Sequence, residues 1–468
     1  MRGDRVKELL TRANDLIWGI PLLVLIMGCG IYLSVLTGFV QIRLFPEAWK
    51  TFIGQFSRRK SENSTGGYRA LCTALAATVG TGNIAGVAGA IALGGPGSVF
   101  WMWIFGVLGM AVKFAEATLA VKYRRRNTSG GYSGGPMYMI ESGMGKNWRW
   151  LAVLYSFFGV VAAFGVGNAT QINTVVTGIN SVIIGFGGTE RTGINLLVGC
   201  VLAVLIAIAL FGGVRRIGMI TEQLVPFACV GYIGLCIAAI ILCRHRLPKA
   251  VCEIISGAFN PKAVTSGMLG SAFIALRVGA SRGLFTNEAG MGTAAMAHAS
   301  SSVKDPLTQG HLGIIEVFLD TIVICSLTAL VILTSGVDIP YGTDTGLALT
   351  AQAFEHIFSP WVQILLSAFL CLFAVATVLG WGLYGTTCAQ YLFGSEKTRL
   401  FVWLQIAVVI LSCLMKTQTV WVLAEAVNGL MAIPNLITLV FLSPQLRMVV
   451  RKRKIPLRVK PEGEGVIQ

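Results

Sequence analysis

The chain has 468 residues, of which 54% are hydrophobic and only 12% are charged, and its formal net charge is +16. Soluble globular domains contain about 25% charged residues. This composition therefore excludes a soluble globule and predicts an all-α polytopic membrane protein, in which backbone amides find their partners within helices.

The first apolar run covers residues 16–36 and follows a charged N-terminal segment. It has about 20 residues, enough to cross a bilayer, and it lacks the small-x-small cleavage site of a signal peptide. We therefore expect it to remain as the first span. In all, the sequence predicts eleven spans, at residues 16–38, 69–93, 98–122, 151–178, 194–211, 220–243, 264–285, 311–334, 361–388, 400–416 and 421–444.

The basic residues indicate how these spans are oriented. If the N-terminus lies outside, most of the 37 Lys and Arg residues fall in cytoplasmic loops and in the C-terminal tail, as the positive-inside rule requires. We therefore expect an outside N-terminus and a cytoplasmic C-terminus. The positive charge reports this topology, and nucleic-acid binding would be the wrong inference from it.

The second span is interrupted at its centre by Gly80-Thr81-Gly82-Asn83. Unwound backbone is tolerated at membrane depth only where it lines a cavity or holds a ligand. Close packing of small residues between helices would explain the glycines, but it does not explain Asn83. The interruption therefore predicts a binding site.

Glycines recur between apolar residues again from 267 to 279, in the seventh predicted span. Without the first span, the two interrupted spans open two five-span halves, residues 69–243 and 264–444. Paired interruptions of this kind are typical of an inverted-repeat transporter with its site near the bilayer midplane. Residues 1–68 then add one span and a loop, and residues 445–468 form a basic cytoplasmic tail.

Several polar side chains inside the spans have two interpretations each. Gln171 could contact a substrate or bond a neighbouring helix, and Trp381 could limit substrate size or simply pack, although its buried indole N–H needs a partner. We expect Lys113 and Glu116 to neutralise each other. Proton coupling through Glu116 or Asp320 is the sharper alternative.

Thr286, Asn287 and Glu288 follow the cytoplasmic end of the seventh predicted span. We expect these residues to form a gate or a loop anchor, with the Glu288 side chain in solvent.

The sequence offers no support for an enzyme or a channel. Its eleven cysteines lie almost all in apolar runs, its four histidines are dispersed, and neither set has the spacing of a metal site. No segment resembles a selectivity filter. We therefore expect no catalytic residues, no disulfide framework and no metal cofactor.

Three segments, Thr78–Gly86, Leu93–Gly97 and Ser281–Gly292, resemble the alanine or glycine:cation symporter family. The resemblance extends over nearly the whole chain. It implies a leucine-transporter-type 5+5 inverted repeat with one extra N-terminal helix. It also implies sodium-coupled uptake of small neutral amino acids, alanine or glycine first, by alternating access in a prokaryotic inner membrane. Beyond the co-transported sodium ion and membrane lipid no cofactor or partner is expected, and the functional unit would be a monomer.

The interruption supplies groups that suit such ligands. Free amides near Thr81, Gly82 and Asn83 favour a carboxylate, and unwound carbonyls favour sodium. The resemblance assigns the sodium ion to the carbonyls of Ala76 and Val79 and to the hydroxyl group of Thr377. The predicted substrate-binding residues are Thr78, Thr81, Gly82, Asn83, Gln171, Phe273, Ile274 and Trp381.

Three positions depart from the family pattern. Gly382 and Thr386 stand where members often carry Ser and Glu, and Glu425 stands where Asp is common. The substrate therefore stays open among alanine, glycine, serine and glutamine, and proton coupling stays open beside sodium coupling.

Overall fold

The structure is a computed structural model that describes residues 17–57, 66–127, 130–185, 187–259, 272–343, 346–414 and 417–452. These residues fold almost entirely into helices, as the composition predicts. Two short strands, β1 (Arg125–Arg126) and β2 (Tyr132–Ser133), pair antiparallel in the loop that follows α7.

The helices follow one another along the chain, and η marks a short 3₁₀- or π-helical stretch. The first part of the chain forms α2 (Ile20–Thr37), α3 (Val40–Arg43), α4 (Phe45–Ser57), α5 (Gly67–Thr78), η2 (Gly82–Gly86), α6 (Val87–Gly94) and α7 (Gly97–Tyr123). The middle part forms α8 (Pro136–Met139), η3 (Ile140–Met144), η4 (Lys146–Trp148), α9 (Arg149–Phe164), η5 (Gly165–Ala169), α10 (Thr170–Gly185), α11 (Thr192–Phe211), α12 (Gly213–Leu242), η6 (Arg244–Arg246) and α13 (Leu247–Phe259). The last part forms α14 (Ala272–Asn287), α15 (Thr293–Ala299), α16 (Pro306–Val317), η8 (Phe318–Cys325), α17 (Ser326–Ser335), α18 (Leu347–Phe358), α19 (Val362–Phe393), η9 (Ser395–Lys397), α20 (Thr398–Ser412) and α21 (Thr417–Lys452).

Among the described residues, eight helical segments are long and apolar enough to cross a membrane, and the bent pair of α5 with η2–α6 raises this number to nine. The other two predicted spans correspond to α20, which has 15 residues, and to α14, which has 16 residues in the described part of the chain. Helix α14 begins after residues 260–271, which lie outside the described part of the chain. The count of eleven spans and the two five-span repeats therefore remain predictions.

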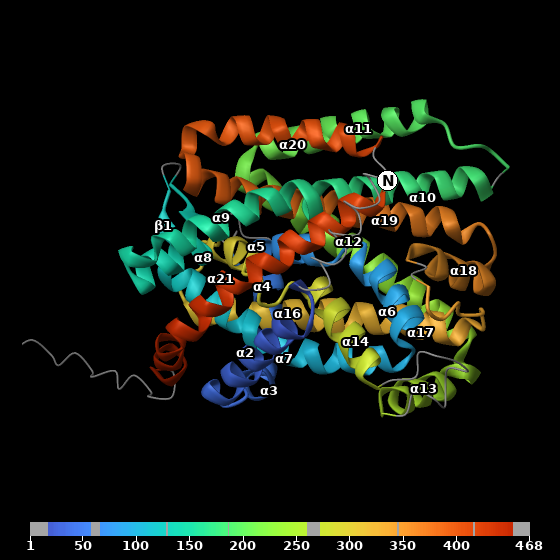
Figure 1. Cartoon of the computed structure of the whole chain (residues 1–468), viewed down its shortest axis with the longest axis horizontal. Coiled ribbons are helices and arrows are strands. Elements are labelled where there is room, and N and C mark those ends of the chain that lie inside the picture. Colours follow the sequence, from blue (N-terminus) through green and yellow to red (C-terminus); the bar gives the residue numbers. More distant parts are fainter. Residues whose placement is uncertain are drawn as a thin grey trace, which may run out of the picture.

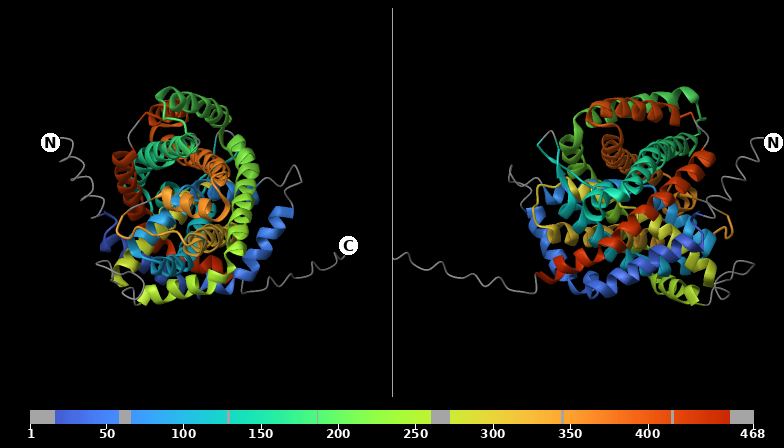
Figure 2. Two further views of the ribbon diagram at one scale, coloured as in Figure 1. Left: turned by 90° about the vertical axis from the view of Figure 1, so that its right-hand side faces the viewer. Right: turned by 60° about the vertical axis from the view of Figure 1, so that its left-hand side comes forward.

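The long helices form one bundle (Figures 1 and 2). In Figure 1, β1 and α8 lie at one end of the bundle, and α13 and α18 lie at the other. The end with β1 carries loops that the positive-inside rule assigns to the cytoplasm. Helices α11 and α20 lie side by side along one edge, whereas α2 packs against α7 and α21.

Three clusters of buried apolar side chains hold the bundle together. One joins α9, α10 and α11 to α19 and α20, the second joins α5 and α6 to α12, α17, α18 and α19, and the third joins α2, α7, α14, α15, α16 and α21. Large apolar side chains such as Leu197, Phe227 and Val230 point outward from the long helices and are exposed. Such a surface suits contact with lipid, which solvates apolar side chains at no cost.

Candidate functional site

The second predicted span is broken where the sequence predicts it. Helix α5 ends at Thr78, η2 begins at Gly82, and the two parts are bent by 52°. The Gly80 amide donates to Asn83 Oδ1 at 2.9 Å, and the Asn83 amide donates to the Gly80 carbonyl at 3.3 Å. In an unbroken helix these two amides would bond the carbonyls of Ala76 and Val79. The break thus releases the two carbonyls that the family resemblance assigns to sodium.

The other side of the break presents amides. The backbone amides of Thr81 and Gly82 donate to no acceptor within the described residues, and they stand at the start of the helical stretch that runs from Gly82 to Gly94. Free amides and the positive end of the helix dipole both attract an anion. Released carbonyls and unpaired amides therefore lie within one short segment.

Asn83 fastens this break to η8. Its side-chain amide donates to Asp320 Oδ1 at 2.7 Å and to the Asp320 carbonyl at 3.2 Å. The Thr321 hydroxyl donates to the other carboxylate oxygen at 2.8 Å. Asn83 and Asp320 are both fully buried. Asp320 is thus the structural partner of Asn83, and the spacing of residues in the sequence did not reveal this contact.

Helix α10 reaches the break through Gln171. The Thr81 hydroxyl donates to Gln171 Oε1 at 3.3 Å, and Gln171 Nε2 donates to the Val166 carbonyl at 3.2 Å. One turn earlier, Gly167 lies directly against Trp381, where a side chain on the glycine would collide with Cβ of the tryptophan. Gln171 and Trp381 are therefore brought to the same site from two helices.

Helix α19 closes the site from the opposite side. A Cβ atom on Gly80 would lie 2.8 Å from the Thr377 hydroxyl, and one on Gly380 would lie 2.9 Å from the Ala77 amide nitrogen. The two helices therefore meet almost backbone to backbone. The Thr377 hydroxyl donates to the Phe373 carbonyl at 3.0 Å, which leaves the lone pairs of its oxygen free to accept.

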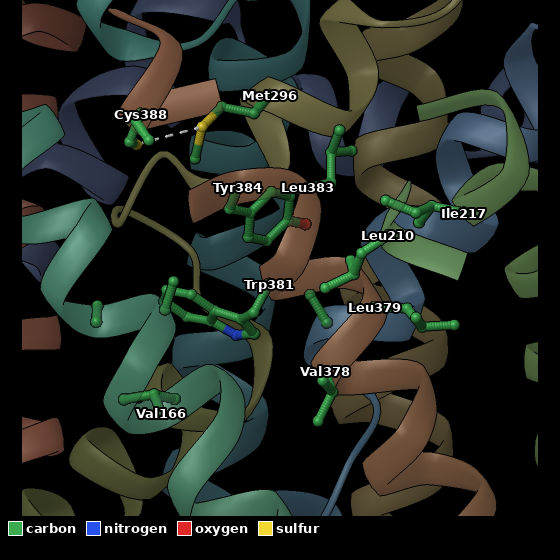
Figure 3. Packing of buried hydrophobic residues seen from close by; sticks show 14 of the residues in the cluster. Val166, Leu210, Ile217, Met296, Val378, Leu379, Trp381, Leu383, Tyr384 and Cys388 are labelled. Carbon is green, nitrogen blue, oxygen red and sulfur yellow. Dashed lines mark hydrogen bonds between the residues drawn. The ribbon is translucent and has the colours of Figure 1, made fainter. Parts of the chain in front are cut away.

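Trp381 is fully buried one turn after Thr377 (Figure 3). Its ring meets that of Tyr384 edge-on, with 5.7 Å between the ring centroids. Its indole N–H donates to Glu288 Oε1 at 3.1 Å. The partner that the sequence required for this N–H is thus Glu288, an acidic residue that directly follows α14.

Only part of the predicted second interruption can be described. Residues 272–287 form the continuous helix α14, and the expected glycines up to 271 lie outside the described residues. A further break in the helices lies between α14 and α15, at residues 288–292, where Glu288, Gly290 and Gly292 all have positive φ. Glu288 is 3% exposed and accepts from the Thr293 hydroxyl at 2.6 Å. The expectation of a solvated Glu288 is wrong, because the chain continues into the buried helix α15.

Two predicted substrate-binding residues lie away from the first break. Phe273 and Ile274 are in the first turn of α14, and Phe273 is 53% exposed. Gly82 is instead faced by Phe285 and Thr286, since a Cβ atom on it would lie 3.7 Å and 3.2 Å from their side chains. Twelve residues of helix, about 18 Å, separate the two pairs. The motif Ser281–Gly292 contained the signal that points to the second pair.

The unwound segment 288–292 is held by α7, α9 and α21. Glu116 Oε1 accepts the amides of Gly290 and Gly292, each at 3.0 Å, and the side-chain amide of Asn435 at 2.7 Å. The Tyr155 hydroxyl donates to the Met291 carbonyl at 3.0 Å. Glycine is needed here because both amides point at one carboxylate from a backbone with positive φ.

Lys113 pairs with a different residue from the one that helix spacing suggests. Its ammonium group lies 3.0 Å from Glu316 Oε1 on α16, and His298 Nε2 lies 3.0 Å from the other oxygen of Glu316. All three side chains are buried. The sequence suggested that Lys113 pairs with Glu116, but Lys113 pairs with Glu316 of a neighbouring helix. Glu116 instead accepts hydrogen bonds from the unwound segment 288–292.

A cavity of about 430 Å³ opens at the end of the bundle that carries β1. Its lining includes Arg69 and Thr73 of α5, together with residues of the loops that the sequence assigns to the cytoplasm. Arg69 forms an ion pair with Glu222 at 2.9 Å, and the Thr73 and Thr221 hydroxyls lie 3.0 Å apart. The cavity thus leads from this end of the molecule toward the helix that carries the first break.

Comparison with known proteins identifies this arrangement. Residues 3–456 match the sodium:alanine symporter family. The chain belongs to this family. The family resemblance inferred from the sequence is thereby confirmed, and the molecule is a symporter and not an enzyme.

Relatives of this symporter align over nearly their whole length. The sodium/alanine symporter AgcS of Methanococcus maripaludis is 41% identical over 93% of this chain and 94% of its own. The probable sodium/glutamine symporter GlnT of Bacillus subtilis is 37% identical over 97% and 91%. The crystal structure of MhsT in complex with L-phenylalanine matches 83% of this chain and 98% of its own, with a TM-score of 0.55 and 14% identity. Such low identity shows the fold alone, which is leucine-transporter-like.

Proposed function

We propose that this symporter carries a small neutral amino acid, alanine or glycine, into the cell together with sodium by alternating access. The observation that carries the proposal is the first break, where released carbonyls and unpaired amides adjoin one another. Helices α10 and α19 enclose this break with Gln171, Thr377 and Trp381, all of them buried. A site of this composition suits a zwitterion and a hard monovalent cation.

The substrate carboxylate would bind the amides of Thr81 and Gly82, with the Gln171 side chain and the Thr78 and Thr81 hydroxyls beside it. Its side chain would then face Trp381, whose indole is fixed by Glu288. Trp381 packs directly against Gly167, where there is no room for a side chain. The Trp381 ring therefore cannot easily move to enlarge the site. The geometry therefore favours a small substrate over a large one.

Sodium would bind the carbonyls of Ala76 and Val79 and the hydroxyl of Thr377. The Thr377 hydroxyl uses its hydrogen on Phe373, so its oxygen is oriented as an acceptor toward the break. The relation to AgcS supports sodium and alanine, whereas the relation to GlnT supports glutamine as the alternative substrate. Proton coupling through the buried Asp320 or Glu116 is the alternative for the ion.

The wider organisation is part of the same proposal. Residues 69–243 and 264–444 would form the two repeats, residues 1–68 the extra N-terminal part, and residues 445–468 a basic tail. The N-terminus would lie outside and the C-terminus in the cytoplasm, in the inner membrane of a prokaryotic cell, with the monomer as the functional unit. The cavity beside Arg69 would then open to the cytoplasm.

Uptake by the purified symporter in liposomes tests this function. A tenfold inward sodium gradient and 100 mV together supply about 3.7 kcal/mol per ion, enough to concentrate a neutral solute several hundred-fold. We expect electrogenic uptake of labelled alanine that collapses when choline replaces sodium, and we expect glycine to compete better than glutamine. Full accumulation driven by a proton gradient alone would refute sodium coupling, and stronger competition by glutamine would refute the substrate.

Replacing Thr377 tests the ion site. Thr377→Ala removes one oxygen ligand without disturbing the helix, so the sodium concentration for half-maximal uptake should rise about tenfold or more, the scale on which metal sites respond to a lost group. Thr377→Ser keeps the hydroxyl and should behave nearly as the wild type. If the alanine variant has the same sodium dependence as the wild type, the ion binds elsewhere.

A further inference from the structure

The unwound segment at residues 288–292 begins with an acidic residue in an unusual conformation. Glu288 has φ of 52°, a left-handed conformation that non-glycine residues rarely adopt because it is strained. Its side chain is nevertheless buried inside the bundle. Residues kept in such a conformation concentrate at ligand sites and switch regions. The hydrogen bond from Trp381 alone does not explain why Glu288 adopts it.

Glu288 belongs to the same site as the first break. Two residues earlier, the Thr286 methyl group lies 3.2 Å from the position of a Cβ atom on Gly82. On the other side, the indole N–H of Trp381 donates to Glu288 Oε1. Trp381 packs so closely against Gly167 that a side chain on this glycine would collide with it. Glu288 is thus bonded to Trp381 of α19, and it lies two residues after Thr286, which faces Gly82 of the first break.

The charge of Glu288 is not matched by an ion pair among the described residues. Lys113 is the basic residue whose charge acts on it, but the ammonium group of Lys113 is bonded to Glu316 at 3.0 Å. Burying a carboxylate without a counter-charge is costly. The two hydrogen bonds from Trp381 and Thr293 occupy only part of the four acceptor positions of a carboxylate, so there is capacity for a further cationic donor.

We propose that the Glu288 carboxylate binds the ammonium group of the transported amino acid. This inference rests on the proposed function. The zwitterion would place its carboxylate on the amides of the first break and its ammonium group on Glu288 of the second, so that each of its charges meets the opposite charge. The substrate would thereby neutralise a buried acid that has no ion pair in the described part of the chain, and ligands without an ammonium group would be rejected.

The alternative role of Glu288 is purely one of position, in which it only orients Trp381. The two roles differ in the ligands that they affect. An ammonium site discriminates between ligands with and without an amino group, whereas a misplaced Trp381 weakens all ligands of similar size alike. Three probes of similar size separate these effects: L-alanine, L-alaninamide, which keeps the ammonium group but lacks the carboxylate, and L-lactate, which keeps the carboxylate but has a hydroxyl group instead.

The experiment measures dissociation constants of the three probes from thermal stabilisation of the purified full chain in saturating sodium. Glu288→Gln keeps an acceptor for Trp381 and removes the charge. We expect it to weaken L-alanine and L-alaninamide at least about tenfold, the worth of one charge-assisted hydrogen bond, and to leave L-lactate unchanged. The control variant Glu141→Gln removes a carboxylate that pairs with Arg125 at the surface. It should retain the wild-type preference for ammonium ligands.

Equal weakening of all three probes in Glu288→Gln would overturn the proposal, and so would a wild type that binds L-lactate as tightly as L-alanine. If Glu288→Gln does not fold, Glu288→Asp keeps the charge but withdraws it by one methylene group. A loss confined to the two ammonium ligands in that variant would support the proposal, and an equal loss would refute it. If either refuting result is obtained while the wild type binds alanine normally, the proposed symport is unaffected. If the wild type neither binds nor takes up alanine, the symport itself is refuted.

Discussion

Gly82→Leu should abolish amino-acid binding while the protein still reaches the membrane. A side chain at this position would press on Thr286 and Phe285 and would stand beside the amides that we assign to the substrate carboxylate. Leucine also favours a continuous helix by about 0.8 kcal/mol over glycine, which would restore the carbonyl bonds that the break releases. We expect no saturable thermal stabilisation by alanine and no sodium-dependent uptake.

A matched control for this variant is Gly234→Leu. Gly234 lies within α12, and a Cβ atom there has nothing within 4 Å, so the same change of residue type should leave binding intact. Wild-type alanine affinity in Gly82→Leu would mean that the substrate does not approach the backbone at this point, and the site would then have to be placed elsewhere.

Lys113→Met should cause the largest loss of stability of all these substitutions. It keeps a long apolar side chain in a fully buried position but leaves Glu316 without its ammonium partner. Breaking one side of a buried ion pair costs about 3–5 kcal/mol, because the remaining charge stays buried. We therefore expect a large fall in the apparent melting temperature of the purified protein, and a partial recovery when Glu316→Gln is added.

The control for this pair is on the surface. Lys249 is 79% exposed and lies 3.8 Å from Glu253, and exposed pairs are worth about 0–1 kcal/mol. Lys249→Met should thus hardly change the melting temperature. If Lys113→Met were no more destabilising than Lys249→Met, the buried pair would contribute nothing net to the stability of the protein.

The first break was predictable from the sequence because its cause is local. Two glycines and an asparagine interrupt an apolar run, and in the structure the Asn83 side chain itself takes the amide that would otherwise continue the helix. The helical class and the family were predictable for similar reasons, since composition and contiguous motifs carry them. Even the need of Trp381 for a polar partner followed from burial alone.

The break at residues 288–292 was not predicted from the sequence, because its causes are distant in sequence. Glycines between 267 and 279 are equally typical of helix packing, whereas the observed break at 288–292 depends on Glu116 of α7 and Asn435 of α21. Likewise, Lys113 and Glu116 share a helix face, but α16 brings Glu316 to the lysine. Contacts between helices decided these cases, and a single sequence does not reveal which helices will be neighbours.

The structure shows where one departure from the family pattern, Gly382, lies relative to the first break. A side chain on Gly382 would meet Leu210 of α11 and would approach Gln405 of α20. This position faces neighbouring helices and not the first break, so a glycine there reflects packing. The side chain of Glu425 lies outside the described residues. The departure at Gly382 therefore gives no reason to change the proposed substrate.

The backbone contact between α5 and α19 at Ala77 and Gly380 has a consequence for leakage. Rotation of a single side chain can open many ion sites, but here only the small methyl group of Ala77 lies between the two helices, and a Cβ atom on Gly380 would collide with it. If sodium binds the carbonyls of Ala76 and Val79 and the hydroxyl of Thr377, as we propose, its release would require these closely packed helices to move apart. Such separation is a rigid-body motion of the kind that alternating access requires. Close contact between α5 and α19 would therefore prevent sodium from leaking down its gradient through symporters that are not transporting substrate.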